Sequence, residues 1–332
     1  MKTKILLAGD VGGTNTRLLL TEYAGEVSKV IFENDYASLE YAEFYDVLER
    51  FLQDSACSLP IDAACFGVAG PVKDNESSVT NLPWVIKAKK ICDILNTSAV
   101  TLINDFVAVS YGVSVLEAKD VIDIQCAGTP TDANSHPTSV LIGAGTGLGV
   151  SCRLWANDHY QIISSEAGHT NFSPATHLQT ELLMWLQKTY SYVSLESILS
   201  GRGFETIYTF LRDVKKIPES SVVRESMNSG NPAKIITDAA LTHKDELCDK
   251  TLELFIQIYG SAAGNSALNY YSVDEVFIAG GIAPKIKQQI NSRLFIDAFN
   301  QKGLMTSNMK KINIKLIMQD KVGLYGALSI LY

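Results

Sequence analysis

The chain has 332 residues, enough for about two domains of roughly 150 residues each; 46% of them are apolar and 19% charged, as in a globular protein with a large core. The formal net charge of −8 argues against a nucleic-acid partner, because a phosphate backbone requires a basic protein face. No apolar run approaches the ~20 residues of a membrane helix, so no membrane partner is expected.

The cysteines give no sign of a disulfide framework or a zinc cluster. All six are scattered along the chain, and none forms a CxxC pair. We therefore expect buried thiols in a reducing cytoplasm. The apolar run Ile5–Ala8 is also shorter than the roughly 7–15 residues of a signal-peptide core.

The first third of the chain predicts a mixed sheet with helices on its face. The expected strands are Ile5–Ala8, Leu18–Tyr23, Val30–Tyr36, Asp62–Pro71 and Val100–Ile103. The expected helices are Leu39–Gln53 and Lys87–Leu95, with a turn-like segment at Ser78–Trp84. The first two strands join through a glycine turn, so they should pair antiparallel.

The rest of the chain restarts this pattern after a run dense in turn-forming residues, Cys126–Ser139, which predicts an exposed loop. The expected elements are then a second glycine hairpin, helices at Thr176–Tyr190 and Asp249–Tyr271, a strand breaking into a Gly-Gly turn within Val276–Pro284, a strand at Asn313–Met318 and a closing helix at Val322–Tyr332. We expect the closing helix to pack back on the first domain.

Two glycine-rich turns are the most informative motifs. The first lies within Gly9–Leu20 and the second within Ile142–Leu154, and each joins two runs of strand type. The tip of such a hairpin offers bare backbone N–H groups that can cradle phosphate. Two such tips suggest two lobes that grip one polyphosphate from both sides.

In the first turn, Asp10 precedes Gly12, Gly13, Thr14 and Asn15. A carboxylate at this place can hold hydrated Mg²⁺, while the glycine N–H groups and the Thr14 hydroxyl face phosphate oxygens. A plain hairpin with an Asx-type turn explains the same residues equally well, so the first turn alone does not decide between them.

The second turn, Gly143–Gly149, carries more glycine than a hairpin needs. Glycine weakens a strand by roughly 0.5–1 kcal/mol per residue, which indicates a local demand for backbone access. Neither turn matches GxxxxGK[ST], so the P-loop interpretation fails. Neither fits GxGxxG, so a dinucleotide-binding fold is disfavoured.

Asn104 and Asp105 follow a strand directly, at the place where open α/β sheets put ligand contacts. An aspartate there can accept a proton from a substrate hydroxyl. Taken alone, the pair is better explained as the start of a helix, with Asp105 as its N-cap.

Two further motifs are open to more than one interpretation. Glu166 and His169 are three residues apart and can bind neighbouring hydroxyl groups, whereas a metal site is disfavoured because only one histidine is present. Gly280 and Gly281 end a buried strand and would let a flat ring system lie against the backbone. Taken alone, the two glycines are better explained as a tight strand-to-helix connection.

Seven motifs, in the same order along the chain, resemble those of the bacterial glucokinases on the non-ROK branch of the hexokinase, Hsp70 and actin superfamily. They are GDVGGTNTR, Thr80–Asn81, INDF, GAGTGLG, EAGH, LESILSG and FIAGGI. The resemblance runs from Gly9 to about Gly326. The ROK branch carries a cysteine-rich zinc motif after its EGGH-like segment, and here no cysteine lies between His169 and Cys248.

The resemblance implies an α/β, two-lobed actin-like (ribonuclease H-like) ATPase fold with mixed sheets and a cleft between the lobes. The small domain would cover residues 1–112, completed by a C-terminal helix at about 319–332, and the large domain residues 113–318. Two departures from the family pattern are EAGH in place of EGGH, with Ala167 adding only a methyl group, and GVAGPV in place of a more polar strand end.

The resemblance also implies a role for each motif. The first phosphate motif would comprise Asp10, Gly12, Gly13, Thr14 and Asn15, with Asp10 holding Mg²⁺ through water. The second phosphate motif would comprise Gly143, Gly145, Thr146 and Gly147, and the adenosine motif Gly280 and Gly281. The sugar contacts would be Asn81, Asn104, Asp105, Glu166, His169 and Glu196, with Asp105 as the catalytic base.

The implied reaction is transfer of the γ-phosphoryl group of ATP to the 6-hydroxyl of glucose, the first step of glycolysis, by a cytoplasmic homodimer that uses Mg²⁺. Two other functions remain open: a nucleotide-switched binding module of the actin or chaperone kind, and a sugar-responsive regulator that kept the fold. Within the kinase interpretation, the alternative acceptor is a related hexose such as mannose or fructose.

Overall fold

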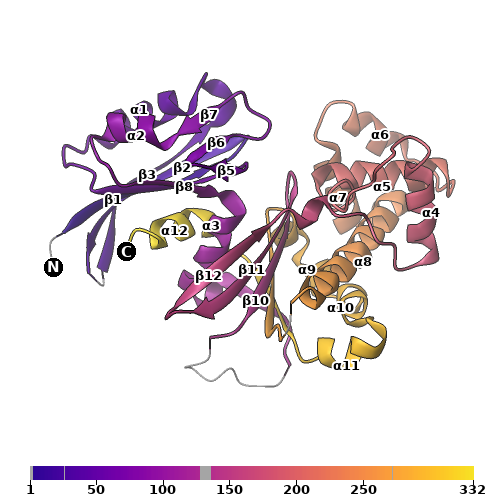
Figure 1. The fold of residues 1–332 in the computed structure, drawn as a ribbon. Coiled ribbons are helices and arrows are strands. Elements are labelled where there is room, and N and C mark those ends of the chain that lie inside the picture. The colour runs from indigo at the N-terminus through magenta and orange to yellow at the C-terminus, as the bar shows by residue number, and fades with distance from the viewer. Residues whose placement is uncertain (1–2, 26, 128–135, 271) are drawn as a thin grey trace. The chain divides into compact units, whose positions relative to one another are not determined.

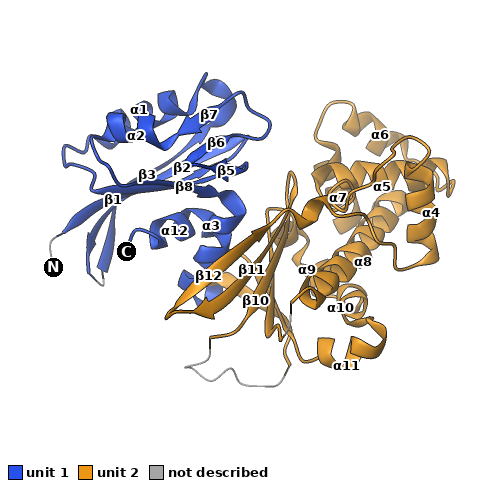
Figure 2. Ribbon diagram, in the orientation of Figure 1, with its two compact units in different colours: residues 1–119, 319–332 blue, residues 120–318 orange. Residues whose placement is uncertain are grey.

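The computed structural model describes residues 3–25, 27–127, 136–270 and 272–332. The chain divides into two units (Figure 2): unit 1 comprises residues 1–119 and 319–332, and unit 2 comprises residues 120–318. The boundary expected after residue 112 stays a prediction. In the expected loop Cys126–Ser139, residues 128–135 lie outside the described part of the chain.

Unit 1 is built on a five-stranded mixed sheet with the order β3-β2-β1-β4-β8. Strands β1, β2 and β3 form an antiparallel meander, as predicted for the first two, and β4 and β8 run parallel to β1. A small antiparallel sheet of β5, β6 and β7 follows β4 in the chain. The strands are β1 Lys4–Val11, β2 Asn15–Ala24, β3 Val27–Ala37, β4 Ala63–Val68, β5 Val72–Lys73, β6 Glu76–Ser78, β7 Val85–Lys87 and β8 Val100–Asn104.

Alternation along β1 gives this sheet two buried faces. Ile5 and Leu7 pack with the apolar side chains of α1 (Phe44–Ser55) and α2 (Ala88–Leu95), whereas Leu6 and Ala8 pack with those of the closing helix α12 (Val322–Ser329). Helix α3 (Asp105–Gly112) lies beside α12 (Figure 1). The closing helix therefore completes the first domain, as the sequence suggested.

The first helix begins later than predicted. Residues Ser38–Glu40 form a single 3-10 turn instead, and α1 begins at Phe44. A capping box explains this start: Glu43 caps the N-terminus of α1, while Asp46 accepts a hydrogen bond from the Glu43 backbone N–H.

Unit 2 is built on a six-stranded sheet with the order β12-β11-β10-β13-β14-β9. Strands β10, β13 and β14 are parallel, and β11, β12 and β9 pair antiparallel with their neighbours. The strands are β9 Val121–Gln125, β10 Ser139–Ala144, β11 Leu148–Ala156, β12 His159–Ser165, β13 Glu275–Ala279 and β14 Asn313–Ile317.

Helix α8 (Glu246–Leu268) is the central helix of unit 2 and packs against α5, α7 and α10 (Figure 1). It starts three residues before the predicted Asp249 because Asp245 caps its first turn, and the predicted last residue, Tyr271, lies outside the described residues. The other helices of this unit are α4 His177–Leu186, α5 Gly201–Asp213, α6 Ser221–Met227, α7 Pro232–Leu241, α9 Lys287–Ile290, α10 Arg293–Asn300 and α11 Thr306–Met309.

The two main sheets share one topology. In each, an antiparallel three-strand meander is extended by two parallel strands, which gives β3-β2-β1-β4-β8 in unit 1 and β12-β11-β10-β13-β14 in unit 2. Each glycine turn joins the first two strands of its meander, β1 to β2 and β10 to β11. The two turns therefore occupy equivalent positions in the two units.

Candidate active site

The first glycine turn is tied down from both sides. The Gly12 N–H donates to the Asn15 carbonyl at 2.9 Å and closes the turn. Ser38 is fully buried; its hydroxyl donates to the Gly12 carbonyl at 2.8 Å, and its backbone N–H donates to the Thr14 carbonyl at 2.9 Å. Thr14 and Asn15 themselves stay exposed. The tip therefore has a fixed shape with polar groups facing solvent.

Asp10 sits near the carboxyl end of β1, beside β4. The pKa of Asp10 is raised to about 6, mainly because the carboxyl group is buried and also because the charge of Asp105 lies nearby. The charge of Arg17 acts in the opposite direction. A carboxyl group held beside a second carboxylate suits a hard cation that takes oxygen ligands, such as Mg²⁺. The donor chemistry at this position thus fits the ion that the sequence implied.

Asn104 and Asp105 divide the roles at the start of α3 differently from the prediction. Asn104 is the N-cap, and its Oδ1 accepts hydrogen bonds from the backbone N–H groups of Phe106 and Val107. Its Nδ2 donates to the Gly70 carbonyl at 3.1 Å. Asp105 is the first residue of the helix, and its Oδ1 accepts from the Phe106 N–H at 2.8 Å. The N-cap interpretation for Asp105 is therefore wrong by one residue.

The Thr80–Asn81 turn approaches the first glycine turn. Asn81 is exposed and has a left-handed backbone with φ 67°. A Cβ placed at Gly13 would lie 3.2 Å from the Thr80 carbonyl oxygen and 3.7 Å from the Asn81 Cβ. Unit 1 thus gathers Asp10, the glycine turn, Asn81 and the Asn104–Asp105 pair at the carboxyl ends of its parallel strands.

The second glycine turn is closed by the Gly145 N–H, which donates to the Gly147 carbonyl at 2.8 Å. The Gly145 carbonyl in turn accepts a hydrogen bond from the N–H of Gly201, the first residue of α5. Gly143 lies inside the buried strand β10, whereas Thr146 is exposed at the tip. The turn therefore presents Thr146 and its neighbouring backbone to solvent.

Gly280 requires glycine for two reasons. Its φ of +81° lies in the left-handed region, and a Cβ there would come within 2.4 Å of the Ala144 carbonyl oxygen. At Gly281, by contrast, a Cβ would meet no atom within 4 Å. The Gly-Gly turn therefore packs tightly against the end of β10 on one side and is open on the other.

Glu166, His169 and Glu196 lie on two segments that meet at the second glycine turn. Glu166 and His169 are both exposed, with 4.0 Å between Glu166 Oε2 and His169 Nε2. The Glu196 N–H donates to the Gly168 carbonyl at 2.9 Å, and Glu196 Oε2 accepts from the Leu148 N–H at 2.8 Å. The structure thus joins EAGH and LESILSG, 26 to 35 residues apart in the chain, to the second glycine turn.

Two supporting residues escaped the sequence analysis. Ser38 was overlooked because a lone serine between a strand and a helix carries no motif. Tyr259, in the middle of α8, is fully buried; its hydroxyl accepts from the Ala144 N–H at 3.1 Å and lies 3.2 Å from the Ala279 carbonyl. Tyr259 therefore links the ends of β10 and β13, where both glycine motifs of unit 2 begin. A tyrosine within a long helix of mixed polar and apolar residues carries no local signal of this role.

Within the part of the chain that the structure describes, no three histidine, cysteine, aspartate or glutamate side chains are grouped so as to hold a metal ion by themselves. None of the helices described there has the length and apolarity that crossing a membrane requires. Any metal at Asp10 would therefore share its ligands with water or a bound substrate.

Known proteins resemble the chain over nearly its whole length. A family profile described as Glucokinase matches residues 7–332. The glucokinase of Trichormus variabilis is 37% identical over 337 residues, covering 97% of each chain, and that of a Synechocystis species is 36% identical over 345 residues, covering 97% of this chain and 96% of the other.

Solved structures of glucokinases are similar to this chain over nearly its whole length. A glucokinase from an Antarctic psychrotroph superposes with a TM-score of 0.82 at 28% identity, covering 100% of this chain and 99% of the other. A glucokinase from Balamuthia mandrillaris in complex with glucose superposes with a TM-score of 0.81 at 21% identity, covering 99% and 93%, and supports the fold alone. The chain has mixed α/β sheets and the actin-like ATPase fold of the sugar kinases. Because the family profile matches from residue 7 to the last residue, the chain belongs to the glucokinase family.

Proposed function

We propose that this protein transfers the γ-phosphoryl group of ATP to the 6-hydroxyl of glucose, giving glucose 6-phosphate and ADP. Membership of the glucokinase family supports the reaction class. The observation that carries the proposal is the set of polar groups at the strand ends of each unit: Asp10 and Asp105 beside the first glycine turn, and Glu166, His169 and Glu196 beside the second.

In unit 1, Asp105 would orient the sugar hydroxyl and take its proton late in the reaction. Its position as the first residue of α3, with one carboxylate oxygen held by the Phe106 N–H, limits the side chain to few orientations. Phosphoryl transfer asks the protein mainly for alignment and charge neutralisation. Asp10 would hold Mg²⁺ through water, which supplies part of that neutralisation when the ion is bound.

The remaining groups would position the two substrates. Glu166, His169 and Glu196 would bind sugar hydroxyl groups, together with Asn81 and Asn104 of unit 1. The backbone N–H groups of both glycine turns would bind phosphate oxygens, and Gly280 and Gly281 would lie against adenosine. Water must be kept from the γ-phosphate, so we further infer that sugar binding draws the two units closer. Small-angle scattering would test this, and an unchanged radius of gyration with glucose would contradict it.

A coupled assay of ADP release tests the reaction itself. The protein is given ATP and Mg²⁺ with glucose, mannose, fructose or no sugar, and the product is identified by mass spectrometry. We expect sugar-dependent ADP release that is fastest with glucose. Slow ADP release that is indifferent to sugar would instead support a nucleotide-switched module. The homodimeric state and the cytoplasmic location remain predictions, and sedimentation would check the first.

A further inference from the structure

A cavity in unit 2 lies next to the segment that carries His169. Its volume is about 370 Å³, within the range of sites for small ligands. One wall is formed by residues of this segment from Ala167 to Ser173, another by the buried Gln179 of α4, and a third by α8 between Ile258 and Asn269. Glu166, His169 and Glu196 are not among its lining residues, so the cavity is separate from the proposed sugar contacts.

The lining of this cavity carries hydroxyl and amide groups but no charge. Eight of its thirteen lining residues are serine, threonine, asparagine or glutamine, and the other five are apolar. Such a wall offers both donors and acceptors to neutral polar groups and apolar surface to C–H groups. It gives no counter-ion to a charged ligand.

Gln179 supplies the most specific group. Its side chain is 1% exposed, and its Oε1 accepts a hydrogen bond from the Ala175 N–H at 2.8 Å. Among the described residues, none accepts a hydrogen bond from its Nε2. The Nε2 atom is not one of the buried polar atoms that lack a partner, so water in the cavity can reach it. Because Gln179 lines the cavity, its Nε2 is available to an acceptor there.

Lys302 contacts two residues that line this cavity, and its hydrogen bonds disfavour an anionic ligand. Its ammonium group donates to the Ser261 carbonyl at 2.9 Å, to the Ser261 hydroxyl at 3.2 Å and to Asn265 Oδ1 at 2.8 Å. These three acceptors use the three donors of the ammonium group. Lys302 therefore orients two residues of the cavity wall and keeps no N–H to bind a phosphate.

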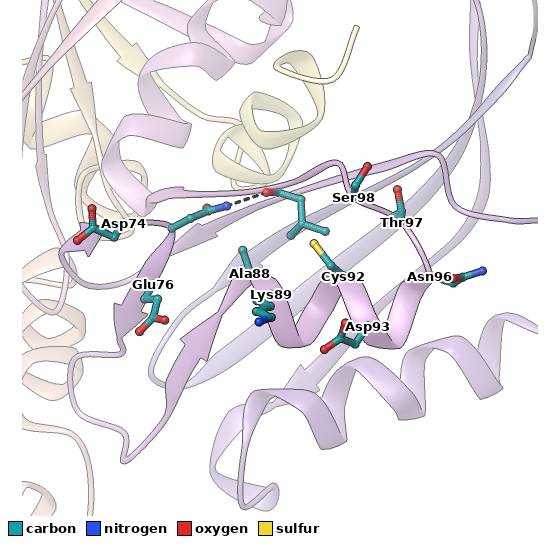
Figure 3. Close-up of a pocket in the computed structure, with 11 residues that line it drawn as sticks. Asp74, Glu76, Ala88, Lys89, Cys92, Asp93, Asn96, Thr97 and Ser98 are labelled. Atoms are coloured by element: carbon teal, nitrogen blue, oxygen red, sulfur yellow. Dashed lines mark hydrogen bonds between the residues drawn. The ribbon is translucent and has the colours of Figure 1, made fainter.

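A larger cavity, in unit 1, is a weaker candidate. This groove in unit 1, of about 750 Å³, lies between the Asp74–Glu76 turn and α2, with Lys89, Cys92 and Asp93 along the helix (Figure 3). The amide of Asn75 is already satisfied, since its Nδ2 donates to the Val100 carbonyl and its Oδ1 accepts from the Leu102 N–H. The Asn75 side chain therefore bonds the edge of β8, and among the described residues that line the groove no buried group is left without a partner.

We propose that the cavity between α4, α8 and the 167–173 segment is a second binding site, for an uncharged polyhydroxylated compound of monosaccharide size. Hydroxyl oxygens of the ligand would accept from Gln179 Nε2, and its hydroxyl groups would bond the asparagine and serine side chains of the wall. The same chemistry is offered by a free sugar and by a linear polyol.

Occupation of this site would bear on the sugar contacts, because Ala167 and Thr170 line the cavity while His169 lies between them in the chain. We expect the bound compound to change the KM for glucose by altering the freedom of this segment. This consequence rests on the proposed function, whereas binding at the cavity does not.

Ligand-observed saturation-transfer NMR on the full chain tests the site, with D-glucitol, glucose and inorganic phosphate as probes. Asn269 lines the cavity mouth and is the exposed C-cap of α8; Asn228 is the exposed C-cap of α6 and is not among the lining residues. Asn269→Leu and its matched control Asn228→Leu therefore make the same change in the same setting. Gln179→Met removes the buried amide at nearly constant volume.

We expect D-glucitol to bind the unmodified protein in the millimolar range. Gln179→Met should weaken binding by about tenfold, the worth of one lost buried hydrogen bond, and Asn269→Leu at the exposed mouth by about threefold. Asn228→Leu should leave binding unchanged, and phosphate should not compete. In Glu166→Gln we expect weak residual binding of glucose at the cavity. If Asn269→Leu removes this residual binding, the cavity also accepts a free sugar.

Three results would overturn the proposal: no D-glucitol binding, D-glucitol binding that Asn269→Leu leaves unchanged, or phosphate competing with the polyol. If Gln179→Met fails to fold, Asn269→Leu at the exposed mouth still decides the matter. Glucose turnover in the unmodified protein is measured separately and tests the proposed function alone. A failure of the proposed cavity site can therefore be distinguished from a failure of the proposed kinase function.

Discussion

Glu196 Oε2 accepts a hydrogen bond from the backbone N–H of Leu148 at 2.8 Å, so a carboxylate expected to bind sugar also holds the second glycine turn. The absence of a side chain at Gly147 makes this possible, because a Cβ there would come within 2.6 Å of the same Glu196 oxygen. The sugar segment and the phosphate turn of unit 2 are therefore coupled through one carboxylate.

Gly147→Ala should break this coupling. The added methyl group displaces Glu196 and removes a hydrogen bond to a charged group, worth about 1.5–3 kcal/mol, so kcat/KM for glucose should fall about 10- to 100-fold. A double-mutant cycle with Glu196→Ala provides the control. In that background Gly147→Ala should cost little, and a full, additive loss would show that Glu196 is not involved.

Asp105→Asn tests the proposed base. The asparagine Oδ1 can still accept from the Phe106 N–H, so α3 should start unchanged and sugar affinity should stay within a few-fold. Turnover should fall by about 10²–10⁴, the usual contribution of a general base. Steady-state kinetics with calorimetric sugar binding separates the two effects, and retained turnover would remove Asp105 from the mechanism.

Asp10→Asn should separate stability from function. Burial and the Asp105 carboxylate disfavour the charged form of Asp10, so the neutral asparagine should raise the free energy of unfolding of the ligand-free protein at neutral pH by about 1–2 kcal/mol. The same change should abolish the stabilisation by ATP with Mg²⁺ in thermal unfolding. Equal stabilisation of both proteins by the nucleotide and metal would rule out Asp10 as a metal-holding group.

The sequence predicted the framework of the fold because its signals are local. The hairpins around the two glycine turns and the strand that ends at Asn104 follow from apolar runs bounded by turn residues. The sequence analysis did not place the helices α5, α6, α7 and α10, although Asn231 and Pro232 mark the start of α7 and Ser200 that of α5. The helices α5, α7 and α10 pack against α8, and α6 packs against α7, so their buried faces are defined by tertiary contacts.

The candidate site was predictable only where a motif marks it. Glu196 and Gly147 were both expected to contact substrates, but their contact with each other joins residues 49 positions apart in the chain. Ser38 and Tyr259 act through a single hydroxyl group on backbone atoms far away in sequence. No local pattern distinguishes such a hydroxyl from one that faces solvent.

Tyr259→Phe tests the role of that buried hydroxyl. Loss of its hydrogen bonds leaves the Ala144 N–H without this partner and should cost about 1–3 kcal/mol of stability while raising the KM for ATP. Tyr208→Phe is the matched control, because Tyr208 is equally buried but bonds Glu219, which is not one of the proposed site residues. Tyr208→Phe should lower stability without changing the KM, and equal KM values in both variants would confine Tyr259 to a structural role.

Lys302 should give the protein a pH-dependent stability in the alkaline range. Burial lowers the pKa of Lys302 from its usual 10.5 to about 8, so between these values the unfolded chain binds more protons than the native state. Native stability should therefore rise with pH across this window, relative to Lys302→Met, which has no group to titrate there. Because Lys302 keeps part of its surface in water, the gain should be about 1–2 kcal/mol rather than the full value of the shift. Urea unfolding of both proteins at pH values from below 8 to above 10 measures it, and a difference in stability that stays constant or shrinks with rising pH would mean that the amine is not desolvated in the native state.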